Sequence, residues 1–218
     1  MDLSHYHKLQ YISQGDTVAI QARNINAALD AGCKWIQVRF KNADQAQVLA
    51  LIDVVKPLCI SYAAILIIND YPELAKITDV DGVHLGLDDL GIKQAREILG
   101  KHKIIGGTAN TIHDVKQRVF EGCNYIGLGP LRFTPTKVKL SPVLGFEGYK
   151  NIIDELKNID AEIPLYAIGG LTLNDIPALM DIGIYGAAVS GVITAHPNKQ
   201  QLIQAFNEAL YEKVNYSR

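Results

Sequence analysis

The chain has 218 residues, of which 48% are hydrophobic, so it can bury a large core, and we expect a single domain over residues 1–218. Its formal net charge of -2, with lysines and arginines scattered along the chain, excludes a basic surface for nucleic acid. Three widely spaced cysteines without a CxxC pair, no apolar signal region and no membrane-length apolar run predict a soluble, cytoplasmic protein without a membrane partner.

Eight short runs rich in β-branched residues alternate along the chain with segments that have helical spacing of apolar residues. We predict strands at residues 9–13, 35–40, 64–69, 82–85, 103–107, 125–129, 165–169 and 186–190. The predicted helices are 19–32, 46–59, 92–100, 111–122, 149–158, 173–183 and 199–210. The only gap in this pattern is short: residues 71–77, after the third predicted strand, lack a clear helical spacing. This alternation predicts the α/β class and a (β/α)8 TIM barrel, with a doubly wound open sheet as the alternative.

A proline-rich loop follows the sixth predicted strand, on the face where barrel enzymes place their active sites. Within this loop, the stretch FTPTK ends in Lys137 and contains Thr134 and Thr136. Two hydroxyls and an ammonium group can bind an anion, because hydroxyls donate hydrogen bonds and the lysine supplies charge. The alternative is a surface loop that proline merely stiffens.

The second predicted strand has one polar face. Gln37, Arg39 and Lys41 alternate with apolar residues, so all three point to the same side of the strand. In a barrel this side faces the lumen near its open end, whereas an edge strand of an open sheet would expose it to solvent. We favour the lumen, because an edge strand has no reason to place two cations at that end.

Carboxylates follow the next two predicted strands. Asn69 and Asp70 end the third strand, and Asp88 and Asp89 follow the fourth. Each pair taken alone is typical of a turn or of a helix cap. Mg2+, however, commonly takes one or two carboxylates together with phosphate oxygens, and the cations of the second strand lie opposite. The combination predicts a site for a diphosphate bound with Mg2+.

A second anion site is predicted after the last two strands. Gly170 follows the seventh strand in AIGG, and Val189 and Ser190 end the eighth strand ahead of a further glycine. Many barrels bind phosphate through the backbone of these two loops, where glycine allows close approach. The alternative is a pair of tight turns that need glycine for their conformation. His84, inside the fourth strand, is interpreted as a structural histidine.

Taken in order along nearly the whole chain, QVRFK, IIND, DGVHLGLDDL, IIGGTANT, YIGLGPLRFTPTK, AIGGL and AAVSGV resemble the thiamine phosphate synthase family, also called thiamine phosphate pyrophosphorylase. The resemblance implies a barrel enzyme, a transferase, that joins hydroxymethylpyrimidine diphosphate to hydroxyethylthiazole phosphate and releases diphosphate. It also implies small-molecule partners and Mg2+ as the cofactor. The sequence leaves the oligomeric state open, a homo-oligomer included.

The resemblance also implies a role for each site residue. The pyrimidine-diphosphate contacts are Gln37, Arg39, Lys41, Asn69 and Thr108; the Mg2+ ligands are Asp70 and Asp89; Lys137 contacts the leaving diphosphate; and the thiazole phosphate lies at Thr134, Thr136, Gly170, Val189 and Ser190. Arg39, Lys41, Thr108 and Lys137 are expected to act in catalysis.

The chain departs from the usual family pattern at four positions. Leu87 and Asp88 stand where GQED is usual, and Thr108 and Asn110 stand where serine and histidine are usual. Thr108 keeps a hydroxyl, so its role is retained. Two other classes remain as alternatives: a related barrel that binds thiazole phosphate as an isomerase or aromatising enzyme, and a phosphate-ligand sensor without catalytic activity.

Overall fold

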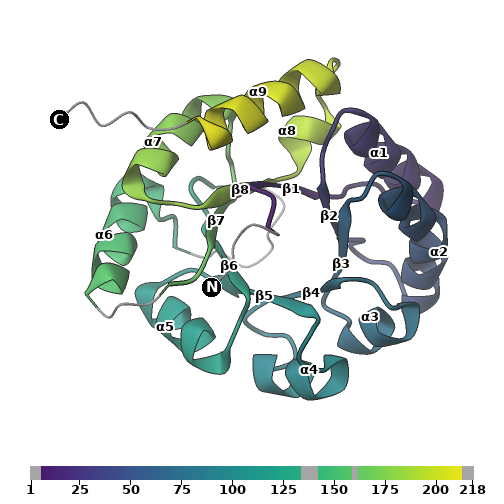
Figure 1. Ribbon diagram of the computed structural model, residues 1–218, viewed down its shortest axis with the longest axis horizontal. Coiled ribbons are helices and arrows are strands. Elements are labelled where there is room, and N and C mark those ends of the chain that lie inside the picture. Colours follow the sequence, from purple (N-terminus) through teal and green to yellow (C-terminus); the bar gives the residue numbers. More distant parts are fainter. Residues whose placement is uncertain (1–5, 134–141, 159–161, 213–218) are drawn as a thin grey trace.

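The computed structural model of the protein describes residues 6–133, 142–158 and 162–212. Eight parallel strands pair in chain order and β8 pairs with β1, so the sheet closes into a barrel, ringed by helices (Figure 1). The strands are β1 (Leu9–Ile12), β2 (Trp35–Val38), β3 (Ile65–Asn69), β4 (Gly82–Leu85), β5 (Ile104–Ala109), β6 (Tyr125–Leu128), β7 (Leu165–Ile168) and β8 (Gly186–Val189). The predicted (β/α)8 barrel is therefore confirmed, and the open sheet is excluded.

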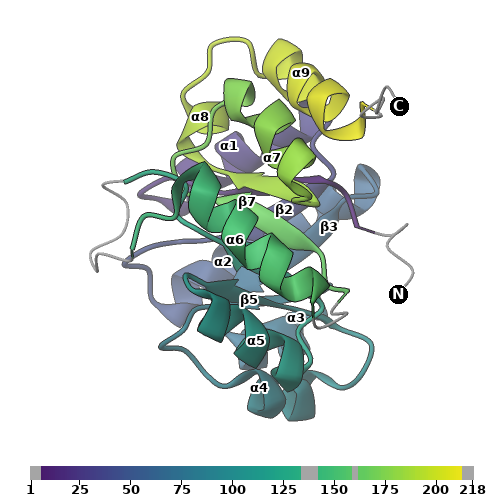
Figure 2. The same ribbon diagram turned by 90° about the vertical axis from the view of Figure 1, so that its left-hand side faces the viewer.

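The helices within these ranges cover the outside of the barrel; α6 and α7, for example, lie over β7 in the side view (Figure 2). They are α1 (Val18–Asp30), α2 (Gln45–Ser61), α3 (Pro72–Thr78), α4 (Ile92–Leu99), α5 (Ile112–Glu121), α6 (Gly145–Lys157), α7 (Ile176–Ile182), α8 (Gly191–Thr194) and α9 (Lys199–Tyr211), with a 3-10 turn η1 (Leu173–Asp175) before α7. In the described part of the chain, no helix has both the length and the apolar composition needed to cross a bilayer.

The connection that lacked a helical pattern contains the short helix α3. Pro72 stands at its start, where the missing N–H costs no hydrogen bond, and Asp79 ends it in a left-handed conformation with φ 49°. Only 7 residues are helical, which is too few for an apolar periodicity to emerge. The prediction of a gap at this position was therefore wrong.

Side-chain caps fix where several helices begin. Thr17 accepts a hydrogen bond from the Ile20 N–H at the start of α1. Asp44 and Thr111 form capping boxes with Gln47 and Asp114 at the starts of α2 and α5. Each cap satisfies backbone N–H groups that the first helical turn leaves without a partner.

The interior consists of two apolar layers separated by the sheet. The larger core lies between strands and helices and includes Ile36 and Val38 of β2. A second cluster, inside the barrel, contains Trp35, Tyr125 and Tyr166, whose ring centroids lie 5.0 to 5.4 Å apart at steep angles. These rings fill the lumen at the level where the strands begin, and on β2 the polar Gln37 follows two residues after Trp35 on the same face.

Candidate active site

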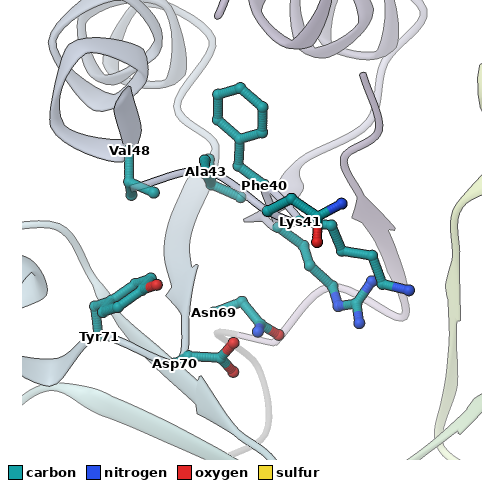
Figure 3. A pocket seen from close by; sticks show the side chains of 10 residues that line it. Phe40, Lys41, Ala43, Val48, Asn69, Asp70 and Tyr71 are labelled. Carbon is teal, nitrogen blue, oxygen red and sulfur yellow. The ribbon is translucent and has the colours of Figure 1, made fainter. Parts of the chain in front are cut away.

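A cavity of about 180 Å³ opens where β2 and β3 end. Arg39, Lys41, Asn69 and Asp70 line it, so the cations predicted from one strand share a cavity with the polar residues predicted from the next. Lys41, Asn69 and Asp70 are labelled in Figure 3. The ring of Phe40, by contrast, points away from Asn69 and Asp70. The remaining lining residues are Val38, Phe40, Asn42, Ala43, Val48 and Tyr71.

Gln37 lies just below this cavity, inside the lumen, with 2% of its surface exposed. Its Nε2 donates a hydrogen bond of 2.7 Å to the Asn69 Oδ1, as the pairing of Gln37 with Ile67 across β2 and β3 allows. Its buried Oε1 accepts no hydrogen bond from the described residues. A buried acceptor without a hydrogen bond destabilises the folded protein, so the Gln37 Oε1 is available to accept an N–H from a ligand.

The backbone of Arg39 is held from two sides. Its N–H donates to the Ser13 Oγ over 3.0 Å, and its carbonyl accepts from the buried Gln21 Nε2 over 3.2 Å. Partial burial lowers the pKa of the Arg39 guanidinium, while Asp70 and Asp89 act in the opposite direction. The guanidinium stays charged, since its ordinary pKa is above 12.

Asp70 and Asp89 bring two carboxylates together from neighbouring loops. Partial burial, followed by the hydrogen bond and the charge of Asp89, raises the pKa of Asp70 to about 7, although Asn69 and Arg39 lower it. The Asp70 N–H donates to the His84 carbonyl over 3.0 Å, and the Asp89 Oδ2 accepts from the Gly86 N–H over 2.5 Å. These bonds fix the Asp70 backbone and the Asp89 carboxylate, and the two side chains interact directly.

Two carboxylates that repel each other beside cations fit a magnesium ion, which would remove the repulsion. Among the residues described by the structure, no three His, Cys, Asp or Glu side chains gather as a metal site. A magnesium ion here would therefore find two carboxylates among the described residues, those of Asp70 and Asp89.

Thr108 lies on β5 inside the lumen and is 8% exposed. Its hydroxyl is 3.0 Å from the His84 Nε2. Two residues on, Asn110 is buried, and its side-chain amide donates to the Gly129 carbonyl. Asn110, one of the departures from the family pattern, therefore joins the ends of β5 and β6, whereas Leu87 is 45% exposed.

The loop after β7 is held to the loop after β6 by Arg132. Its guanidinium donates to both carboxylate oxygens of Asp175, over 2.7 and 2.6 Å, and to the Gly170 carbonyl over 3.1 Å. Gly169 and Gly170 have φ angles of 84° and 73°, which side chains other than glycine rarely adopt. The Arg132 hydrogen bonds were not foreseen, because its partners are 38 and 43 residues away in the sequence.

The end of β8 lies beside β1. Val189 is buried and pairs with Tyr11, and the Ser190 Oγ donates to the Ile12 carbonyl over 2.6 Å. Because the Ser190 hydroxyl already donates to a strand carbonyl, a ligand at this point would contact the Ser190 backbone. Thr134, Thr136 and Lys137 fall outside the described residues, and their predicted roles stay predictions.

The model of the family described as thiamine monophosphate synthase matches residues 11–193. The chain is 56% identical over 209 residues to the thiamine-phosphate synthase of Flavobacterium johnsoniae, which covers 96% of this chain and 99% of that protein. It is also 56% identical to the thiamine-phosphate synthase of Flavobacterium psychrophilum, over 94% of this chain and all of that protein.

Solved structures agree with these relatives. The thiamine phosphate pyrophosphorylase from Pyrococcus furiosus superposes with a TM-score of 0.80 at 25% identity and covers 93% of this chain and 95% of its own. A 3-hexulose-6-phosphate synthase shares the fold alone, with a TM-score of 0.71 at 16% identity, over 94% of this chain and all of its own. With the family model matched from β1 into α8, this chain belongs to the thiamine monophosphate synthase family.

Proposed function

We propose that this protein is a thiamine-phosphate synthase, a transferase. It joins 4-amino-5-hydroxymethyl-2-methylpyrimidine diphosphate to 4-methyl-5-(2-hydroxyethyl)thiazole phosphate and releases diphosphate. The observation that carries the proposal is that Arg39 and Lys41 line one cavity with Asp70, and that Asp70 and Asp89 both act on the Arg39 guanidinium, two residues beyond the buried Gln37. An isomerase of thiazole phosphate has no need of this combination.

The aminopyrimidine ring is assigned to the lumen beside Gln37. The Gln37 Oε1 accepts from the amino group of the ring and so gains the partner that it lacks among the described residues. Asn69 holds the Gln37 amide in this orientation, since its Oδ1 accepts the Gln37 Nε2–H. Thr108 contacts the same substrate from the opposite side of the lumen.

The diphosphate is assigned to the cations at the mouth. Arg39 and Lys41 offset the negative charge that grows on the leaving oxygen, with Lys137 as a third cation. Asp70 and Asp89 would hold Mg2+, which would neutralise part of the charge of the diphosphate.

The reaction is a dissociative substitution. The bond between the pyrimidine methylene carbon and the diphosphate oxygen breaks, and its electron pair leaves with the diphosphate. The lone pair of the thiazole nitrogen then forms the new carbon–nitrogen bond. No protein nucleophile is required, so the site contributes charge stabilisation and positioning.

The cysteines support a mechanism without a protein nucleophile. Burial raises the pKa of the thiol of Cys33 to about 11 and that of Cys59 and Cys123 to about 12, so all three stay protonated at neutral pH. All three are free and buried. Free thiols fit the reducing cytoplasm, where we expect the enzyme to act.

The thiazole phosphate is assigned to the opposite side of the mouth. Gly170, Val189 and Ser190 present backbone there, and Thr134 and Thr136 supply hydroxyls. Arg132 and Asp175 hold the Gly170 loop in the conformation that such backbone contacts need.

The direct test is incubation of the purified protein with both substrates and Mg2+, followed by assays of diphosphate and thiamine phosphate. Formation of both products, dependent on both substrates and abolished by EDTA, supports the proposal. Conversion or binding of thiazole phosphate alone, without diphosphate release, would instead identify the isomerase or the sensor.

A matched pair of variants tests the metal ligands. Asp89→Asn removes one carboxylate at nearly constant shape, so turnover falls strongly and recovers in part at raised Mg2+. Asp88→Asn removes the same charge one residue away and serves as the control. Equal turnover of both variants at low Mg2+ would remove Asp89 from the metal site.

A further inference from the structure

Four polar side chains form one hydrogen-bonded row across the barrel lumen. The Gln10 Nε2 of β1 donates to the Tyr125 hydroxyl of β6 over 3.2 Å, and that hydroxyl lies 2.9 Å from the His84 Nδ1 of β4. The His84 Nε2 lies 3.0 Å from the Thr108 hydroxyl of β5. The row starts in the sealed interior and ends at a residue assigned to the substrate.

Glycines on β5 and β6 leave space for the two rings in this row. A Cβ added at Gly106 would lie 2.1 Å from the Tyr125 ring, and one at Gly127 would lie 3.0 Å from the His84 Cε1. Tyr125 is fully buried, and Gln10 and His84 are 1% and 7% exposed. Since water has little access, each donor in the row depends on an acceptor in the protein.

The buried hydroxyl of Tyr125 determines the direction of the row. Its oxygen accepts the Gln10 N–H, and within the described residues its own proton can go only to the His84 Nδ1. A neutral imidazole with an acceptor at Nδ1 carries its proton on Nε2, which then donates to the Thr108 oxygen. The Thr108 hydroxyl proton is then available to donate to a group in the lumen.

We propose that His84 is a positioning residue that, as the Nε2–H tautomer held by Tyr125, fixes the Thr108 hydroxyl as a hydrogen-bond donor to an acceptor atom of the pyrimidine diphosphate. The assignment of substrate rests on the proposed function, whereas the direction of the row rests on the contacts alone. His84 was interpreted from sequence as a structural histidine; this row gives it a role in substrate orientation.

A double-mutant cycle tests whether Tyr125 acts through Thr108. Tyr125→Phe keeps the ring and deletes only the hydroxyl, so it lowers kcat/KM for the pyrimidine diphosphate by about three- to tenfold, the loss of roughly one net hydrogen bond. The KM for thiazole phosphate stays unchanged. In the Thr108→Val background the same change costs less than about twofold further, since the donor that it orients is already absent.

Two further variants complete the cycle. Thr108→Ser keeps the hydroxyl and retains the response to Tyr125→Phe. Tyr166→Phe is the matched control, because Tyr166 is a buried neighbour of Tyr125 whose hydroxyl donates instead to the His7 carbonyl over 2.8 Å. Its effect is the same with Thr108 or with valine at that position. Equal losses from Tyr125→Phe in both backgrounds would overturn the positioning role.

The tautomer is measured without reference to activity. Long-range 1H–15N NMR of protein labelled in its six histidine rings, with the His84 signals identified by their loss in His84→Gln, is expected to show the Nε2–H form. An Nδ1–H form would mean that the row runs in reverse and would refute the proposal. If the wild-type enzyme formed no thiamine phosphate, the proposed function would fail, yet the tautomer would still decide the direction of the row.

Discussion

Asp70→Asn is expected to stabilise the metal-free protein at alkaline pH while it damages the magnesium site. Partial burial and the neighbouring Asp89 raise the pKa of Asp70 to about 7. A carboxyl with a raised folded-state pKa contributes its full stability below its unfolded pKa near 4, and that stability is lost as pH rises through 7. Asparagine stays neutral, and it tolerates the φ of 75° at this position.

The size of the effect follows from the pKa shift. A rise from 3.8 to about 7 corresponds to about 4 kcal/mol if the carboxyl were fully shielded. The Asp70 carboxyl is only partly shielded from solvent, so screening reduces this to about 1–2 kcal/mol. For a domain of this size, that difference raises Tm by about 2 to 8 °C.

The assay is thermal unfolding of both proteins in EDTA at pH 4.5 and pH 8, repeated at pH 8 with Mg2+. In EDTA, the variant has the higher Tm at pH 8, and most of the difference disappears at pH 4.5. Mg2+ raises the Tm of the wild-type protein and leaves that of the variant unchanged. Asp53→Asn, a charge change on the exposed surface of α2, is the control. A Tm difference independent of pH, or equal stabilisation of both proteins by Mg2+, would refute this reasoning.

Two further predictions concern the opposite side of the mouth. The hydrogen bond from Arg132, and then those from Thr172, hold the pKa of Asp175 at about 2 against the effect of burial. Asp175→Asn therefore lowers the free energy of unfolding in urea at pH 7 by about 1–2 kcal/mol. The wild-type protein loses the same contribution as pH falls from about 4 to 2. In steady-state kinetics Lys137→Ala lowers kcat by roughly 10²-fold, whereas Gly170→Val, whose Cβ would lie 2.9 Å from the Arg132 Cβ, mainly raises the KM for thiazole phosphate.

Each of these predictions has a clear contrary outcome. A stability loss in Asp175→Asn that persists unchanged at pH 2 would show that the Arg132 ion pair is not its source. If Lys137→Ala changed only the KM for thiazole phosphate while Gly170→Val left that KM alone, the two anion sites would be assigned to the wrong substrates. Circular dichroism establishes that each variant is folded before its kinetics are read.

The sequence alone was sufficient for the architecture. Apolar periodicity and β-branched runs are local properties, and they located all eight strands to within two residues at either end. The alternation of Gln37 and Arg39 with apolar neighbours likewise predicted the face that enters the lumen. The short helix α3 was missed, because its 7 residues carry too little periodic signal.

Which residues of different strands and loops come into contact is determined only by the closed barrel. The Gln37 and Asn69 side chains are 32 residues apart in sequence, and Arg132 and Asp175 are 43 apart. Periodicity places a side chain on a face of its own strand, but it carries no information on the register between strands. The register sets the height of each side chain in the lumen, and hence the row from Gln10 to Thr108 depends on how β1, β4, β5 and β6 pair around the ring.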